Sequence, residues 1–350
     1  MPTHVSDKTL SPWYTALSTL IGRTRRASYF LTADIGGTQI RAALCDESGH
    51  IHRRAHTLTY ASEGKDAVIR RIRETLIQAL GDLPLNHVCG IGVVAPGPLD
   101  PQTGVIVFAP NLPGWENVPL RQIIQNYFGL PVSVGNDANL AALGEHRFGA
   151  GRGVRNLIYI TVSTGIGGGV IADGRMLLGA RGFAAEVGHH TIEADGPRCN
   201  CGNIGCLETF ASGPAIARMA REAIASGANS LLRDMVHGQL DQITSRLVYE
   251  AALQNDTLAI STFHRAGRYL GIGIVNLLHL FNPEMIIIGG SVAKAGDFLF
   301  NSMWETIRAR SHPIYWEDLR IVPPALGDDV GLLGALALVL SDTEARVPAG

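Results

Sequence analysis

The sequence lacks an apolar run of the roughly 18 residues needed to cross a bilayer. Its most apolar stretch, Leu270 to Phe281, is shorter and contains Asn276 and His279. The N-terminus has no apolar segment of the secretory type. A surplus of positive charge is also missing, because 29 Lys and Arg stand against 31 Asp and Glu. These absences predict a cytoplasmic protein that binds neither a membrane nor nucleic acid.

Cysteine is scarce as well, and an odd count of five argues against a disulfide framework. Cys45 and Cys89 fall in apolar segments and are expected in the core. The other three crowd into residues 199–206 and need a separate explanation. Glycine, in contrast, is abundant at 41 residues, which indicates tight turns and loops where backbone approaches a ligand.

A chain of 350 residues is long enough for about two domains. Apolar periodicity predicts an α/β protein with two similar units, each opening with a β-hairpin around a glycine-rich turn. Strands are expected at 29–34, 41–45, 51–58, 88–95, 132–134, 157–162, 168–171 and 285–288. Helices are expected at 66–80, 120–128, 139–148 and 330–340, with a helical stretch from 214 to about 280.

The first glycine turn reads Asp34-Ile-Gly-Gly-Thr38. Gly36 and Gly37 leave room for a phosphate, and their N–H groups together with the Thr38 hydroxyl can donate to its oxygens. Asp34 is placed to hold Mg²⁺ through water, because magnesium keeps most of its hydration shell. A plain β-turn with a surface aspartate explains the same residues.

The second glycine turn repeats this logic within the segment Thr161–Gly169. Its candidate donors are Thr164, Gly165, Gly167 and Gly168. A third pair, Gly289 and Gly290, ends an apolar strand and can let an adenine or ribose lie against backbone, although it also suits an ordinary strand-to-helix turn. Two such turns at matching places favour a nucleotide site over a simple glycine-rich hairpin.

Between the two units stands the segment Val134-Gly-Asn-Asp-Ala-Asn139. A strand that ends at Asn136 and Asp137 should project both side chains at the mouth of a cleft. A carboxylate there can accept the proton of an attacking hydroxyl, which is the general-base task in phosphoryl transfer to an alcohol. Helix capping is the structural alternative, because Asn and Asp are favoured N-caps.

The most specific pattern is Glu186-Val-Gly-His189 followed by Cys199, Cys201, Cys206 and Glu208. One histidine and three cysteines form the nitrogen and sulfur set that tetrahedral Zn²⁺ prefers, and four protein ligands make such a site structural. Its use would be to lock the loop that carries the two glutamates. His190 competes with His189 by position, and ordinary reduced cysteines are the alternative.

In this order the motifs resemble the ROK family, which is named after repressors, open reading frames and kinases. The resemblance covers about residues 29–342. The segments that carry it are Asp34–Thr38, Ala95–Pro98, Pro110–Trp115, Asn136–Asp137, Thr164–Gly169 and Cys199–Glu208.

This resemblance implies the actin-like, hexokinase-like fold (ribonuclease H-like), in which two α/β domains close over a cleft. It places an N-terminal extension at 1–28, a small domain at 29–135 plus 328–345, and a large domain with the zinc loop at 136–327. The last helix is then expected to pack back on the small domain.

The resemblance also implies transfer of a phosphoryl group from ATP, with Mg²⁺, to O6 of a hexose. Glucose is expected first, because 110–115 and 202–208 look most like the glucose-phosphorylating members. Asp137 resembles the catalytic base. The residues that match sugar ligands are Asn111, Asn136, Asp137, Glu186, His189 and Glu208. His189, Cys199, Cys201 and Cys206 match the structural zinc site, with the other nitrogen of His189 left for the sugar.

Two positions depart from the family pattern. Ala185 stands where a glycine usually precedes the glutamate, and Gln39 stands where a lysine often follows the first phosphate turn. The first is expected to adjust the sugar loop, and the second leaves ATP binding more to backbone and magnesium.

Several alternatives remain open from the sequence. Relatives with these motifs phosphorylate fructose, mannose, N-acetylmannosamine or N-acetylglucosamine, or use polyphosphate, and a non-catalytic sugar sensor is a further class. A DNA-binding repressor is disfavoured, because only 33 residues precede Asp34 and a winged helix needs about 60–80. A homo-oligomer, dimer or tetramer, is expected from the relatives.

Overall fold

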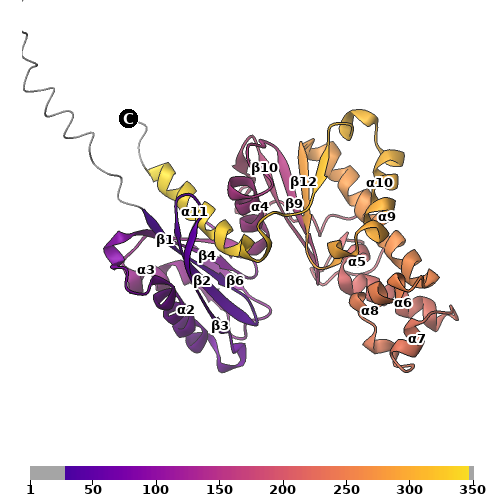
Figure 1. Cartoon of the computed structure of the whole chain (residues 1–350), viewed down its shortest axis with the longest axis horizontal. Coiled ribbons are helices and arrows are strands. Elements are labelled where there is room, and N and C mark those ends of the chain that lie inside the picture. Colours follow the sequence, from indigo (N-terminus) through magenta and orange to yellow (C-terminus); the bar gives the residue numbers. More distant parts are fainter. Residues whose placement is uncertain (1–27, 347–350) are drawn as a thin grey trace, which may run out of the picture.

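The computed structural model describes residues 28–346, so all but the last residue of the predicted N-terminal extension lies outside the described part. Two five-stranded sheets dominate it (Figure 1). The first runs in the order β3 (Ile51–Leu58), β2 (Gln39–Asp46), β1 (Tyr29–Ile35), β4 (Val88–Ala95), β8 (Val132–Asn136). The second runs in the order β11 (Arg175–Met176), β10 (Ile166–Ala172), β9 (Leu157–Val162), β12 (Met285–Gly289), β13 (Arg320–Val322). A small third sheet joins β5 (Leu99–Asp100), β6 (Val105–Phe108) and β7 (Glu116–Val118).

Helices cover both faces of each large sheet. They are α2 (Lys65–Leu80), α3 (Leu120–Phe128), α4 (Asp137–Phe148), α5 (Glu208–Ala211), α6 (Gly213–Ala225), α7 (Leu232–Met235), α8 (Ser245–Leu253), α9 (Thr257–Phe281), α10 (Asp297–Arg310) and α11 (Val330–Arg346). Single turns of 3-10 helix occur at 61–63, 85–87, 240–242, 292–295, 313–315 and 327–329.

The first sheet follows the two-residue period of a strand buried on both faces. Phe30 packs on one face against leucines of α11, while Leu31 and Ala33 pack on the other face against α2 and α3. Figure 1 shows α11, drawn in yellow, lying along the first sheet and far from α10, the helix that precedes it in the sequence. The expectation that the last helix packs back on the first unit is therefore met.

The second sheet is layered in the same way. Ile158 and Ile160 face the α6, α8, α9 and α10 side, whereas Leu157 and Tyr159 face α4. Each sheet therefore has its own core. The domain boundaries placed at 135/136 and 327/328 stay a prediction.

Helix α4 meets α11 where two glycines face each other. A Cβ on Gly144 would lie 2.9 Å from the Gly334 nitrogen, and a Cβ on Gly334 would collide with the Leu140 carbonyl. Glycine is needed at this crossing because the two helix backbones approach too closely for side chains. The helix that packs on the second sheet is thereby joined directly to the helix that packs on the first.

Beside this crossing lies Glu145 of α4, which is fully buried. Its carboxylate accepts the N–H groups of Ala150 at 2.8 Å, Ala325 at 3.0 and 3.1 Å, and Leu326 at 2.9 Å. A buried carboxylate is costly unless hydrogen bonds replace its water, and these amides do so. Glu145 thus fixes the segment that leads from the second sheet into α11.

Three sequence expectations differ from the structure. The helical stretch from 214 to about 280 is four helices, because Thr244 and Asp256 act as N-caps of α8 and α9 and Asn255 takes a left-handed backbone. The small third sheet and α10 were not predicted at all. Cys89 is exposed on β4 and not in the core, while Cys45 is buried as expected.

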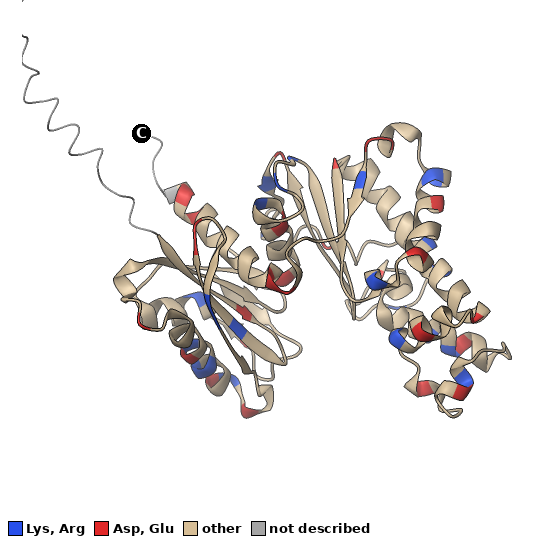
Figure 2. Ribbon diagram, viewed as in Figure 1, with Lys and Arg blue, Asp and Glu red and all other residues tan. Residues whose placement is uncertain are grey.

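Charge on the outer helices is mixed. Arg70 and Glu74 of α2, Arg218 and Glu222 of α6, and the i,i+4 pair at 246/250 of α8 place opposite signs one turn apart. Figure 2 shows the alternation of blue and red on these elements. Within residues 28–346, no helix combines the length and apolar character that a membrane crossing requires.

Candidate functional site

The two key carboxylates of the first sheet lie at one edge. Strands β1, β4 and β8 are parallel neighbours, so their carboxyl ends meet at the same side. Asp34 is the penultimate residue of β1, and Asp137 follows β8 directly. Loop residues at this edge of an α/β sheet are the usual place for a ligand. The topology therefore brings together two residues that the sequence places 103 positions apart.

Asp137 is the first residue of α4, and its neighbour does the capping. The Asn136 side-chain oxygen accepts the Asn139 N–H at 2.9 Å, as an N-cap does. The Asp137 carboxylate accepts only the adjacent Ala138 N–H, at 2.8 Å, among the hydrogen bonds of the described chain. Capping and a carboxylate with spare acceptor capacity thus coexist, and the two interpretations of this motif do not exclude each other.

The surroundings of Asp137 raise the pKa of its carboxyl. Solvent reaches the residue, yet protein atoms surround the carboxylate on most sides, and this loss of hydration is the main cause. The Ala138 N–H acts in the opposite direction, and the negative charge of Asp34 raises the pKa further. A raised pKa makes the ionised carboxylate a stronger base.

At the first glycine turn, Gly36 is already engaged. Its N–H donates to the Gln39 carbonyl at 2.9 Å and closes the hairpin between β1 and β2. The assignment of Gly36 to a phosphate stays a prediction, and Gly37 with Thr38 are the donors of this turn that the hairpin bond does not use. Gly37 is pressed against Asn111, since a Cβ on it would lie 2.9 Å from the Asn111 Cβ.

The carboxylate of Asp34 has a partner that the sequence did not suggest. Arg41, directly opposite on β2, pairs with it, and the same guanidinium donates to the Asp328 carbonyl at 2.6 Å. The Asp34 side chain also lies against Gly331, where a Cβ would collide with it. A cation that binds Asp34 must share it with Arg41. Gln39 leaves no charge at its own position, so Arg41 supplies the positive charge on this turn.

The second glycine turn lies at the carboxyl edge of the second sheet. Gly167 packs against Ala138 of α4, because a Cβ added to Gly167 would lie 3.1 Å from the Ala138 Cβ. A Cβ added to Gly168 would collide with the Val187 side chain. Strand β12, parallel to β9, ends at Gly289 on the same side. The next residue, Gly290, takes a φ of +94° against the Val162 carbonyl.

Gly213, the first residue of α6, contacts the second glycine turn and was not among the residues expected from the sequence. The Ser163 carbonyl accepts the Gly213 N–H at 2.8 Å, and the Ser163 hydroxyl lies 3.0 Å from the Ser291 hydroxyl. The turn holding Thr164 and Gly165 therefore meets the Gly289–Gly290 turn and the N-terminus of α6. A Ser-Gly-Pro sequence at 212–214 is a helix-start signal that could have pointed to this position.

Glu208 joins the second glycine turn to the cysteine loop. Its carboxylate accepts the Ile166 N–H at 2.8 Å, and a Cβ on Gly165 would lie 2.6 Å from the same oxygen. The other carboxylate oxygen lies 3.8 Å from the Cys199 sulfur. A shift of the cysteine loop would therefore move a group that contacts the glycine turn.

Glu186 belongs to the same electrostatic cluster. Burial raises the pKa of its carboxyl, the nearby His189 lowers it, and the negative charges of Asp137 and Glu208 raise it further. Asp137, His189 and Glu208 thus each lie close enough to Glu186 for their charges to act on its carboxyl. Asn111 lies with Gly37 on the side of the first sheet.

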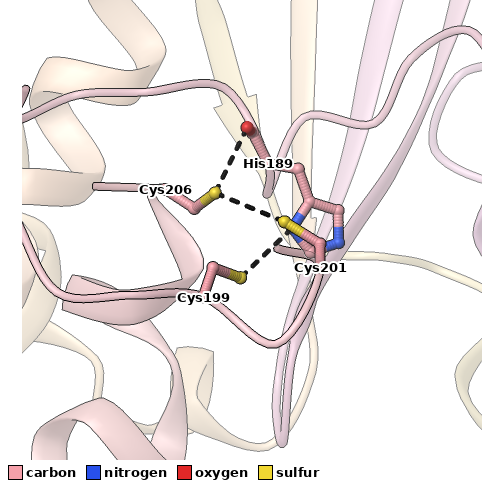
Figure 3. Close-up of side chains that lie close together, drawn as sticks. All are labelled: His189, Cys199, Cys201 and Cys206. Carbon is pink, nitrogen blue, oxygen red and sulfur yellow. Dashed lines mark hydrogen bonds between the residues drawn. The ribbon is translucent and has the colours of Figure 1, made fainter. Parts of the chain in front are cut away.

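The four predicted metal ligands converge (Figure 3). His189 Nδ1 and the sulfurs of Cys199, Cys201 and Cys206 all lie within 4.8 Å of one another. The Cys201–Cys206 sulfur distance and the Cys199–His189 distance are both 3.7 Å. Ligands at Zn–S and Zn–N bond lengths in a tetrahedron would stand about 3.8 and 3.6 Å apart. The donor set and its spacing therefore fit zinc, with His189 and not His190 as the nitrogen donor.

Backbone contacts shape the cysteine loop around these groups. The Cys206 thiol donates to the His189 carbonyl at 3.3 Å, and the Asn203 amide donates to the same carbonyl at 3.2 Å. Burial is the main reason why the pKa of Cys206 rises to about 12. A cation that binds here must therefore displace a proton from this thiol.

Ala185 takes a left-handed backbone with a φ of +67°. This conformation suits glycine and costs an L-residue roughly 1–2 kcal/mol. The family's usual glycine at this position therefore has a backbone reason. The departure strains the turn just before Glu186 without removing any of the clustered side chains.

Comparisons with known proteins identify the family of this chain. The model of the ROK family matches residues 30–342. A glucokinase of Thermotoga maritima is 37% identical over 306 residues, which are 87% of this chain and 95% of that protein. A xylose repressor of Caldicellulosiruptor bescii is 35% identical over 88% of this chain and 77% of its own length. The structure of a ROK family glucokinase from Streptomyces griseus, in complex with glucose and AMPPNP, is similar with a TM-score of 0.71 and 34% identity, covering 89% of this chain and 98% of that one.

The chain belongs to the ROK family. Its fold is the actin-like, hexokinase-like two-domain α/β fold, as expected from the sequence. Kinases and repressors both stand among its relatives, so the family alone does not decide between them.

Replacing Ala185 with glycine is expected to relieve the left-handed strain. The gain of roughly 1–2 kcal/mol is partly offset by the greater freedom of glycine in the unfolded chain, about 0.4–1 kcal/mol. We expect Ala185→Gly to unfold at the same or higher denaturant concentration than the parent. Ala184→Gly, one residue earlier and outside the left-handed region, should unfold at a lower concentration. Equal losses in both variants would contradict the strain argument.

Proposed function

We propose that this protein is an ATP- and Mg²⁺-dependent kinase that phosphorylates a hexose at O6, with glucose as its substrate. The observation that carries the proposal is the position of Asp137. It stands at the sheet edge shared with Asp34, beside the second glycine turn through Ala138, and within electrostatic reach of Glu186. A base between a phosphate site and a group of sugar-binding side chains is what phosphoryl transfer to an alcohol needs.

In this proposal Asp137 accepts the proton of the sugar's primary hydroxyl as that oxygen attacks the γ-phosphorus. Bound Mg²⁺ would neutralise charge on the phosphates. Asp34 offers the oxygen ligand that magnesium prefers, directly or through water, and Arg41 offers a positive charge beside it. Gly37, Thr38, Thr164 and Gly165 supply backbone and hydroxyl donors to the nucleotide, with Gly289 and Gly290 against its nucleoside.

The sugar is held in this proposal by side chains from several segments. They are Asn111, Asn136, Glu186, His189 and Glu208. Carboxylates and amides suit this task, because each accepts or donates hydrogen bonds to two hydroxyls. His189 can direct Nδ1 to a metal and keep Nε2 for a sugar hydroxyl. Division of the chain at 135/136 and 327/328 would let the two parts close over the reactants and exclude water.

Glucose is preferred because the Thermotoga relative is named a glucokinase and the Streptomyces structure holds glucose with AMPPNP. The xylose repressor favours a second candidate, a sugar-binding protein without turnover. An intact base and two intact glycine turns support catalysis instead, since a sensor has no need of them. Other hexoses, N-acetylhexosamines and polyphosphate remain the alternative substrates.

The test is an ADP-release assay with Mg-ATP across a panel of hexoses and N-acetylhexosamines. We expect turnover with glucose, and we expect Asp137→Asn to lower kcat by at least about a hundredfold, as loss of a general base does. Glucose binding, followed by calorimetry, should be largely kept in this variant. Asp173→Asn, which changes an exposed aspartate of the β10–β11 turn, is the matched control and should retain parental kcat.

Each contrary result points to one alternative. Turnover with another sugar keeps the mechanism and changes the substrate, and turnover with polyphosphate alone changes the donor. Sugar binding without turnover on any donor supports the sensor. Near-parental kcat in Asp137→Asn removes Asp137 as the base.

The raised pKa of Asp137 sets the direction of the pH dependence. The base must be ionised, so activity should be full above its pKa and fall as the pH drops through it. Because burial and the Asp34 charge both raise this pKa, the acid limb of kcat/KM should lie above the usual range of an aspartate. A profile that stays flat down to the ordinary aspartate range would contradict this assignment.

We also propose that His189, Cys199, Cys201 and Cys206 hold a structural Zn²⁺. Cys199→Ser should abolish stoichiometric zinc, measured by elemental analysis, and lower glucose affinity because Glu208 contacts the same loop. Cys89→Ser changes an exposed cysteine outside the cluster and should keep both properties. Full zinc content in Cys199→Ser, or parental glucose affinity after zinc is lost, would overturn this proposal.

A further inference from the structure

A pocket of about 410 Å³ lies away from the sheet edges that carry the candidate site. Its volume falls within the usual range of small-molecule sites, about 300–1,000 Å³. Its lining includes Ser48, Arg147, Phe148, Arg152, Leu326 and Leu333. They come from the β2–β3 turn, the end of α4 and the loop after it, and the segment that leads into and forms α11. The pocket thus touches elements that pack on both large sheets.

The lining has two kinds of chemistry. Phe148, Leu326 and Leu333 offer an apolar surface, and Arg147 and Arg152 offer two guanidinium groups, with no carboxylate among the lining residues. Arg147 is paired with Glu344 at 2.6 Å. Within residues 28–346, no ion pair or side-chain hydrogen bond engages the Arg152 guanidinium. Charge complementarity therefore favours an anion with an apolar body.

The walls of the pocket are close-packed where the two parts meet. Gly49 takes a φ of +90°, and a Cβ on it would lie 2.8 Å from the Phe148 ring. The Glu145 carboxylate, three residues before Phe148 on α4, accepts hydrogen bonds from the Ala325 and Leu326 N–H groups. These contacts give the pocket defined walls, because its aromatic and aliphatic residues are fixed by neighbours from distant segments.

Helix α4 connects this pocket to the candidate site. Asp137 is its first residue, and Phe148, its last, lines the pocket. The Gly144–Gly334 crossing lies between them on the same helix. A ligand that contacts Phe148 and Leu333 therefore touches both helices of the crossing and can change how the two sheets sit relative to each other.

We propose that this pocket is a regulatory site for a small organic phosphate, with the phosphate on Arg152 and Arg147 and the apolar body on Phe148. Phosphate is preferred as the anionic group because guanidinium groups bind it in a bidentate manner. Occupancy alters sugar phosphorylation through α4, so this second half of the proposal rests on the kinase function proposed above.

The chain's own N-terminal residues are a weaker occupant on charge. Tyr29 of β1 lies opposite Asp46 of β2 in the antiparallel ladder. The chain therefore enters β1 beside the turn that contains Ser48. Residues 1–27 contain Lys8, Arg23, Arg25 and Arg26 but a single acidic residue, Asp7. Their net charge has the same sign as the pocket, which disfavours this segment relative to an anion.

The test uses phenyl phosphate, which combines a phosphate with an apolar ring, titrated calorimetrically into the full chain. Arg152→Glu should weaken its binding by at least about tenfold, the effect of losing a charge-assisted hydrogen bond and adding a like charge. Arg310→Glu, at an exposed arginine that ends α10, should bind as the parent does. Arg152 is itself exposed, so melting temperature should confirm that both variants fold.

No binding at millimolar phenyl phosphate overturns the site. Equal affinity in the parent and Arg152→Glu also overturns it, because the probe would then bind elsewhere. Removal of residues 1–27 should leave affinity unchanged, and a large gain in affinity would identify that segment as the true occupant. These readouts need no turnover, so they stand or fall independently of the kinase proposal.

The regulatory half is tested with the pocket saturated. Phenyl phosphate should change KM or kcat for glucose by about fivefold or more in the parent, at the lower end of usual coupling, and not in Arg152→Glu. An active parent whose kinetics do not respond overturns regulation. An equal response in Arg152→Glu shows competition at the active site and also overturns it. If the parent protein shows no kinase activity in the absence of phenyl phosphate, the result contradicts the kinase proposal instead.

Discussion

The contact on which the rest of the structure depends is the crossing of α4 and α11. Two glycines, Gly144 and Gly334, let the helix backbones touch, and the buried carboxylate of Glu145 ties the incoming chain to the same place. One helix packs on each large sheet, so this crossing decides how the two sheet edges face each other. The position of Asp137 relative to the first glycine turn follows from it, because Asp137 begins the helix that carries Gly144 and Glu145.

The two large sheets share one arrangement of strands. In each, a hairpin with a glycine turn lies beside parallel strands whose carboxyl ends gather at one edge. Successive apolar residues of each strand point to opposite faces of the sheet, and helices cover both faces. Polar groups are therefore found mainly at the strand ends. The candidate site is consequently made of residues next to strand ends, such as Asp34, Asp137 and Gly165, and of one loop, 186–208, anchored by the cysteine cluster.

Much of this was predictable from local patterns. The expected strand positions, the two hairpins and the gathering of three cysteines follow from periodicity and close spacing, and the structure confirms them. The choice of His189 over His190 came from the family resemblance, and the structure places His189 with the cysteines. What the patterns did not show depended on which groups become hydrogen-bonded or paired once the hairpin forms. Arg41 looked like an ordinary strand residue until pairing placed it opposite Asp34, and the Gly36 amide bonds to Gln39 within the same hairpin. Cys89 was misplaced because an apolar strand near its start can still show one residue to solvent.

The small sheet of β5, β6 and β7 has a consequence for how such a protein can change. It is an excursion of the chain between β4 and α3 that carries Asn111 and buries its own apolar residues, among them Ile106 and Trp115, against the first core. The register of the large sheets does not depend on its length. Insertions or exchanges within 99–118, away from Asn111 and its contact with Gly37, can therefore accumulate during descent and alter the shape of this side of the candidate site, while Asp34 and Asp137 keep their places at the strand ends.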